Sequence, residues 1–189
     1  MSFDFFGYAA RCAEKLCFSV AYNNLRGYAA AERTDVVKQL VCEAWNRARV
    51  SGGILIFAYI IMPDHTHIIT DNARSISDAL RFTNGIAANK IIKYLKENEH
   101  ASSLAKLREQ VKDKNHKYSL WQHHPNAFSI NGEDTLMQKV NYIHQNPARA
   151  GLVEKAEDYR FSSARLWRGN PLDDEPFITD HKQIDWRAA

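Results

Sequence analysis

The chain has 189 residues, of which 45% are hydrophobic and 25% are charged, and its formal net charge is +3. These values are ordinary for one globular domain with a real core, so they exclude an intrinsically disordered chain and an integral membrane protein. A small positive charge permits a polyanionic partner without requiring one.

The cysteine spacing and the lengths of the apolar runs indicate in which cellular compartment the protein is expected. The three cysteines lack Cys-x-x-Cys spacing, which argues against a disulfide framework or zinc ribbon and predicts reduced thiols in the cytoplasm. The first twenty residues show no basic region followed by an unbroken apolar run, and the longest apolar run, 54–62, is too short to span a bilayer. We therefore expect neither an export signal nor a membrane helix.

Strand and helix patterns alternate in the first half of the chain. Residues 15–22 are rich in β-branched and aromatic residues and predict a strand, whereas residues 32–50 carry apolar residues at helical spacing. After Ser-Gly-Gly, the apolar run 54–61 predicts a strand covered on both faces. A Met-Pro-Asp turn then leads into a strand over 65–70, so these two strands are expected to form an antiparallel hairpin.

The second half of the chain completes the pattern. A long amphipathic helix over about 75–95 precedes the polar stretch 99–118, which indicates a helical excursion or a mobile loop. Residues 119–130 predict an edge strand, and residues 134–146 predict a further helix. This order predicts an α+β fold of the ferredoxin-like kind, with helices on one face of an antiparallel sheet, the other face left available, and an added C-terminal helix.

Two histidines stand one residue apart in the stretch IIMPDHTHI, at the start of a predicted strand. Because alternate side chains of a strand share a face, His65 and His67 are expected to point the same way, which suits a metal ion. A hydrogen-bonded or surface pair of histidines is the alternative explanation of this motif.

The predicted helix over 134–146 carries a tyrosine beside its apolar stripe. Leu136, Val140 and Ile143 recur at helical spacing, and Tyr142 is rotated by about 100° from the last of them. Asn146 follows four residues after Tyr142, so the phenol and the carboxamide share a face. The proline that comes next places this amide at a frayed last turn. Amphipathic packing is the alternative role for such a tyrosine.

The stretch MPDHTH and the downstream stretch NYIHQNPARAGLVEKAEDYRFSSAR together resemble the REP-associated tyrosine transposases, relatives of the IS200/IS605 transposases in the HUH superfamily of single-strand nucleases. The resemblance covers most of the chain. It implies a Y1 transposase-like catalytic domain over 1–152, with 99–118 as an insertion, and a basic, aromatic extension over 153–189 on or near the DNA site. Thr66 and Asp64 depart from the apolar residue and the asparagine usual in the family.

The resemblance also implies a mechanism and a set of site residues. Tyr142 matches the catalytic tyrosine, and His65, His67 and Asn146 match the residues that hold one divalent ion, Mg²⁺ or Mn²⁺. Such an enzyme cuts and rejoins single-stranded DNA at REP-like hairpins through a 5′-phosphotyrosine. Because histidine ligands must be neutral, its activity is expected to fall at acid pH.

Basic and aromatic residues are the expected DNA contacts. Phosphate contacts are predicted for six cations, because such groups displace counterions from nucleic acid: Arg74, Arg81, Lys90, Arg149, Arg160 and Arg165. Core packing is the expected role of Tyr159, Phe161 and Trp167, and stacking on unpaired bases is the alternative. The expected partner is single-stranded DNA with a hairpin, with no membrane and no small-molecule cofactor, for a monomer or homodimer in the cytoplasm near the nucleoid.

Three other functions remain open from the sequence. A HUH replication initiator would share the ion and the tyrosine. A catalytically inactive protein could bind structured DNA or RNA, although the presence of Tyr142, both histidines and Asn146 argues against that. A zinc hydrolase using His65, His67 and a later histidine would never form a covalent adduct with DNA.

Overall fold

A computed structural model of the chain describes residues 17–24, 35–71, 75–111, 116–121 and 126–184. Within these ranges four strands form one sheet in the order β2-β3-β1-β4, and each neighbouring pair is antiparallel. The strands are β1 (Cys17–Asn24), β2 (Ile56–Ile61), β3 (His65–Asp71) and β4 (Asn126–Asn131). This order and direction are those of the ferredoxin-like sheet, so the predicted fold class and the predicted β2-β3 hairpin are confirmed.

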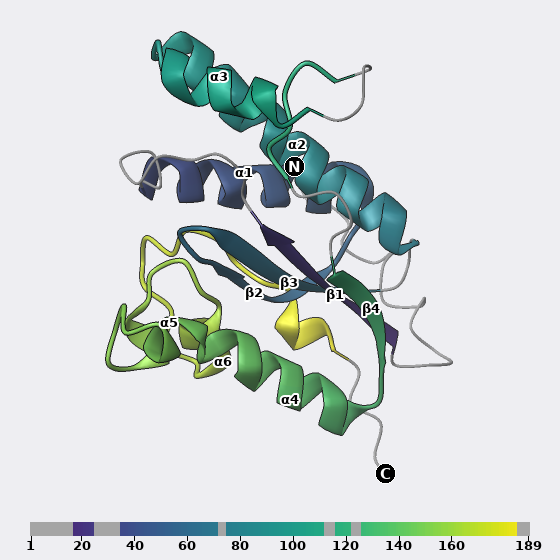
Figure 1. Cartoon of the computed structure of the whole chain (residues 1–189). Helices are drawn as coiled ribbons and strands as arrows, with labels where there is room; N and C mark the ends of the chain where they lie inside the picture. The colour runs from purple at the N-terminus through teal and green to yellow at the C-terminus, as the bar shows by residue number, and fades with distance from the viewer. Residues whose placement is uncertain (1–16, 25–34, 72–74, 112–115, 122–125, 185–189) are drawn as a thin grey trace, which may run out of the picture.

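The helices lie in two layers on opposite faces of the sheet (Figure 1). The first layer contains α1 (Asp35–Gly52) and α2 (Ile76–Glu97), which pack against each other, and α4 (Glu133–His144) lies on the other face. The short elements are α3 (Ala101–Glu109), α5 (Asn146–Arg149), η2 (Ala156–Asp158), α6 (Ala164–Trp167) and η3 (His181–Gln183). No helix of the described ranges combines the length and the apolar character needed to cross a bilayer.

Strand β2 is fully buried, because the segment after α5 pairs with its outer edge. The backbone N–H of Ile61 donates to the carbonyl of Phe161 at 2.9 Å, and the N–H of Ser163 donates to the carbonyl of Tyr59 at 3.1 Å. Further along, the N–H of Ile56 donates to the carboxylate of Asp180 at 2.8 Å. These bonds use backbone groups that an edge strand would otherwise expose, which explains why an unbroken apolar run is stable here.

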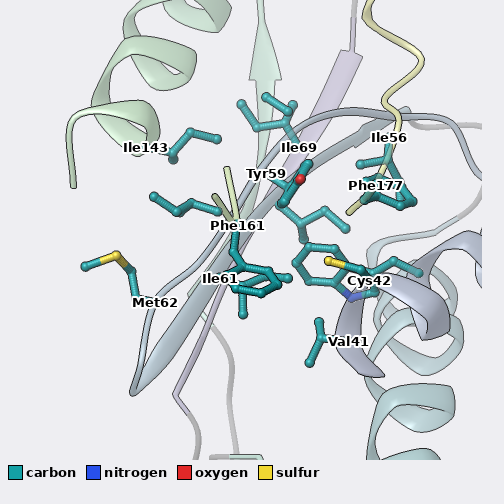
Figure 2. Packing of buried hydrophobic residues seen from close by; sticks show 14 of the residues in the cluster. Val41, Cys42, Ile56, Tyr59, Ile61, Met62, Ile69, Ile143, Phe161 and Phe177 are labelled. Carbon is teal, nitrogen blue, oxygen red and sulfur yellow. The ribbon is translucent and has the colours of Figure 1, made fainter. Parts of the chain in front are cut away.

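The main core lies between β2 and α1. Trp45 of α1, Tyr59 of β2 and Phe177 meet edge to face, with ring centroids 5.2 to 6.4 Å apart. Cys42 of α1 is a free, buried thiol in the same cluster (Figure 2). Phe177 belongs to the predicted extension over 153–189, so the described part of that extension shares the core of the domain.

One expectation about the layers changes, and the helical alternative for the stretch 99–118 is confirmed. The sheet face opposite α1 and α2 is not left open, because α4 crosses it and buries part of its surface (Figure 1). The polar stretch 99–118 contains a helix, α3, in which Leu107 is buried and its carbonyl accepts a bond from the N–H of Ser119 at 2.9 Å. The apolar stripe of this helix is too short to be visible as a period in the sequence.

Candidate active site

The two histidines stand at the start of β3, on the face that α4 covers. Their ring centroids lie 5.1 Å apart at an interplanar angle of 85°. His67 is paired across the hairpin with Ile60, and its ring contacts α4. The prediction that His65 and His67 share one face of a strand is confirmed.

Asp64 orients the first of these histidines. Its Oδ1 atom lies 2.7 Å from Nδ1 of His65, a distance that fits a hydrogen bond from a protonated Nδ1 to the carboxylate. Such a bond fixes the tautomer of the ring and places the lone pair of the ring nitrogens on Nε2. In the sequence Asp64 stood out only as a departure from asparagine. The position of this carboxylate directly before His65 could have predicted from the sequence that Asp64 bonds to the ring.

His67 is held in its neutral form. The side chain is 5% exposed beneath α4. Burial lowers its pKa to about 3, and the nearby charges of His65 and Arg149 lower it further in the same direction. A neutral imidazole at ordinary pH is the form that binds a metal ion.

Tyr142 lies where the buried His67 meets solvent. The predicted stripe of Leu136, Val140 and Ile143 is buried against the sheet, and this orientation of α4 leaves Tyr142 49% exposed. Its ring centroid is 6.0 Å from that of His67, edge to face at 86°. The phenol is therefore accessible to a large substrate and close to the histidines.

Proline 147 explains the placement of Asn146. Since Pro147 has no N–H, the carbonyl of Ile143 lacks its helical donor, and Nδ2 of Asn146 donates to that carbonyl at 3.3 Å instead. The helix breaks at Gln145, and Asn146 begins the separate turn α5. With the amide nitrogen turned toward the helix, Oδ1 is the amide atom that the proposed ligand role would use.

Arg149 connects the tyrosine and the amide. Its Cζ atom lies 4.4 Å from the centroid of the Tyr142 ring. Its Nη2 atom donates to the backbone carbonyl of Tyr142 at 2.5 Å and lies 3.4 Å from Oδ1 of Asn146. One guanidinium thus lies on the phenol ring and beside the candidate ligand, so that Arg149 is the predicted phosphate contact nearest the tyrosine.

The donor set fits a divalent ion that binds phosphate. Two imidazoles and a carboxamide oxygen are neutral donors, so a bound cation would keep its full positive charge for an anionic substrate. The described residues contain no group of three His, Cys, Asp or Glu side chains placed to hold a metal. The predicted set is of another type, since its third donor is an amide.

His144 ties the tyrosine helix to the sheet. Its Nε2 atom lies 2.7 Å from Oγ of Ser163, and that hydroxyl also accepts a bond from the N–H of Tyr59 at 2.9 Å. Burial lowers the pKa of His144 to about 4, so the ring stays neutral in the folded protein. This contact was not predicted from the sequence. His144 stands four residues after Val140, so helical spacing could have predicted that its side chain lies on the buried side of the helix.

Most of the other predicted phosphate contacts lie away from Tyr142. Arg81 and Lys90 are on α2, in the layer on the opposite sheet face, where they pair with Asp78 at 3.2 Å and with Glu43 at 2.7 Å. Arg160 forms an exposed ion pair with a carboxylate 2.8 Å away. Arg74 lies outside the described residues.

The role predicted for Arg165 is corrected, because its side chain is buried in the fold. Its guanidinium pairs with Glu175 at 3.0 Å, and the Glu175 side chain is only 1% exposed. It also donates to the backbone carbonyls of Glu157 at 2.7 Å and Arg160 at 3.1 Å. These bonds hold the segment after α5 together and leave no surface for a phosphate.

We expect Arg165→Ala to destabilise the protein by about 3–5 kcal/mol, because it leaves the buried carboxylate of Glu175 without its partner. Urea denaturation measures this effect. Arg160→Ala removes an exposed ion pair of the same segment and should change stability little. A folded Arg165→Ala protein of unchanged stability and weakened DNA binding would restore the original prediction.

Core packing, the role expected for three aromatic residues, is confirmed, and the alternative of base stacking is not supported. Tyr159 is buried, and its hydroxyl donates to the carbonyl of Ile61 at 2.9 Å. Phe161 is 3% exposed, and Nε1 of Trp167 donates to the carbonyl of Phe57 at 2.9 Å. All three rings fasten the C-terminal segment to β2.

Neither a protein-family model nor a curated protein sequence matches the chain. Among solved structures, a REP-associated tyrosine transposase bound to a REP hairpin is similar over 91% of this chain and 90% of that one, with a TM-score of 0.57 and 19% identity. A candidate transposase of Deinococcus radiodurans, also 19% identical, is similar over 69% of this chain and 90% of its own, with a TM-score of 0.43. The similarity over nearly the whole length of both chains shows that this protein has the fold of a REP-associated tyrosine transposase.

Proposed function

We propose that the protein cuts and rejoins single-stranded DNA at hairpin sequences, with Tyr142 as the nucleophile. One observation carries the proposal: the half-exposed phenol lies 6.0 Å from the buried ring of His67 and directly under the guanidinium of Arg149. The similar solved structure is bound to a REP hairpin, which supports a hairpin as the DNA form for this chain too. Such a protein would work in the cytoplasm at the nucleoid.

His65, His67 and Asn146 would hold a divalent ion, Mg²⁺ or Mn²⁺. When bound, the ion supplies a Lewis acid that draws charge from the non-bridging oxygens of the scissile phosphate. The protein contributes the neutral donors, and Asp64 fixes the ring orientation of His65.

The phenol oxygen of Tyr142 attacks the phosphorus atom and displaces the 3′-oxygen of the neighbouring nucleotide. The products are a 5′-phosphotyrosine and a free 3′-hydroxyl, and attack by a second 3′-hydroxyl reverses the step without external energy. Arg149 places a positive charge over the ring that carries the attacking oxygen. Because the phenol is half exposed, its proton can pass to water.

The form of the substrate tests this proposal. We expect cleavage of an unpaired strand, or of a hairpin with an unpaired flank, and none of a fully paired duplex. A paired backbone is too stiff to bring one phosphate into contact with a residue of β3 and one of α4 together. The assay compares a pool of labelled hairpin strands with randomised flanks, alone and annealed to their full complements, at equal salt and Mn²⁺.

The same assay separates the other candidate functions. Equal cleavage of the duplex would contradict the proposal and favour a conventional metal nuclease. Tight binding of the hairpins without any cleavage would favour an inactive DNA-binding protein. A HUH initiator would cleave single strands as well but at a replication origin rather than at REP-like hairpins.

A further inference from the structure

The exposed side of α4 carries more rings and cations than the proposed reaction uses. On β4, Phe128 is 39% exposed, and Nζ of Lys139 on α4 lies 5.2 Å from its ring centroid. One helical turn after Lys139 comes Tyr142, 49% exposed, with the guanidinium of Arg149 4.4 Å from its ring centroid. We call Phe128, Lys139, Tyr142 and Arg149 the ring-cation row.

The position of Phe128 is not explained by core packing. Through β1, the strand register places Phe128 on the same sheet face as His67. Ile130 is two residues further along that face and is 1% exposed. The core on this side of the sheet therefore ends at Ile130, and Phe128 extends beyond it on the edge strand.

The charge on Lys139 also faces outward. Among the described residues no carboxylate lies within ion-pair distance of Lys139. By contrast, Lys90 and Arg81 each have an acidic partner. A cation that lies against an exposed ring, without an acidic partner among the residues that the structure describes, is suited to an anion that also carries an aromatic group.

We propose that the ring-cation row binds the unpaired DNA strand next to the cleavage point, with a base stacked on Phe128 and its phosphate on Lys139. The alternation of ring and cation matches the alternation of base and phosphate along a single strand. Lys139 can move from the ring to the phosphate, since its side chain is long and flexible. The position relative to the cleaved bond rests on the proposed function of Tyr142.

The distance between Lys139 and Tyr142 along α4 limits which phosphate Lys139 can contact. Residues three apart on a helix have Cβ atoms about 5 to 6 Å apart, so Lys139 and Tyr142 can contact successive phosphates or phosphates about two nucleotides apart. Phe128 then receives a base next to those phosphates. Because every base has a stacking face, this contact selects unpaired DNA over duplex and is tolerant of sequence.

Binding without turnover tests the stacking contact. In a Tyr142→Phe protein with EDTA present, the affinity for a labelled oligo(dT) strand is measured by fluorescence anisotropy. Phe128→Ala should weaken binding about tenfold, and Phe128→Trp should restore it. Val36→Ala removes a side chain of α1 that is 47% exposed on the other layer, and it should have no effect. A 2-aminopurine base in the strand should lose fluorescence when it stacks on the Phe128 ring. The loss should be seen with Tyr142→Phe alone and not with Tyr142→Phe, Phe128→Ala.

The lysine has a separate readout. Lys139→Gln should lower the slope of log affinity against log salt by about 0.7, the loss of one phosphate contact on a single strand. Lys93→Gln changes an exposed lysine of α2 and should leave that slope unchanged.

Two results would overturn the inference: unchanged oligo(dT) affinity in Phe128→Ala, or an equal loss of affinity for oligo(dT) and for duplex DNA. Circular dichroism checks that each variant is folded. Since these assays need no cleavage, a protein that stacks DNA on Phe128 and never forms an adduct would refute only the proposed function. A protein that forms the adduct but binds oligo(dT) with unchanged affinity in Phe128→Ala would refute only this inference.

Discussion

Tyr142→Phe is expected to abolish the covalent adduct between the protein and single-stranded DNA while leaving DNA affinity nearly unchanged. The substitution removes only the hydroxyl, so the ring still packs under Arg149 and beside His67. An interaction used only in the chemical step lowers the rate and leaves binding of the substrate intact. Denaturing electrophoresis of labelled hairpin strands incubated with Mn²⁺ shows the adduct as a band that survives unfolding of the protein.

Tyr118→Phe is the matched control. Tyr118 is another partly exposed tyrosine with an arginine beside it, since Nη2 of Arg108 lies 3.4 Å from its hydroxyl. Its neighbouring cations lower its pKa, led by the hydrogen bond from Arg108. The adduct should form normally in Tyr118→Phe. Loss of the adduct there, or its persistence in Tyr142→Phe, would refute the assignment of the nucleophile.

His65→Ala and His67→Ala are each expected to remove high-affinity binding of Mn²⁺ and with it all cleavage. Each deletes one of three proposed donors. The structure also separates their effects on folding. His67 is 5% exposed under α4, so His67→Ala leaves a cavity and should cost about 1–3 kcal/mol, whereas the more accessible His65 should cost less. Calorimetric titration with Mn²⁺ and urea denaturation measure the two quantities.

Two neighbouring substitutions separate an effect on ion binding from general damage to β3. Asp64→Asn keeps a hydrogen-bonding group at His65 but removes the carboxylate, and should weaken ion binding by about tenfold to a hundredfold. Thr66→Val changes the residue between the histidines, which is buried on the opposite face, and should leave Mn²⁺ affinity unchanged. Equal affinity in wild type, His65→Ala and His67→Ala would show that the ion is held elsewhere or not at all.

Local periodicity in the sequence was enough to predict the elements and the direction of several side chains. Alternation along a strand placed His65 and His67 on one face, and the spacing of Leu136, Val140 and Ile143 predicted the buried stripe of α4. These predictions hold because they depend on bond geometry within a few residues. The order of elements likewise predicted the ferredoxin-like sheet, since short connections limit how strands can pair.

The neighbours of each functional side chain were decided only by the tertiary structure. A period shows that one side of α4 is buried, but not that the helix crosses the face of the sheet that carries His67. The residue type alone likewise does not distinguish Arg149 from Arg165. In the fold, one guanidinium lies on an exposed tyrosine ring, and the other is buried against a carboxylate ten residues away. Burial and ion pairing depend on contacts between segments distant in the chain, so a residue's type and its local pattern do not determine them.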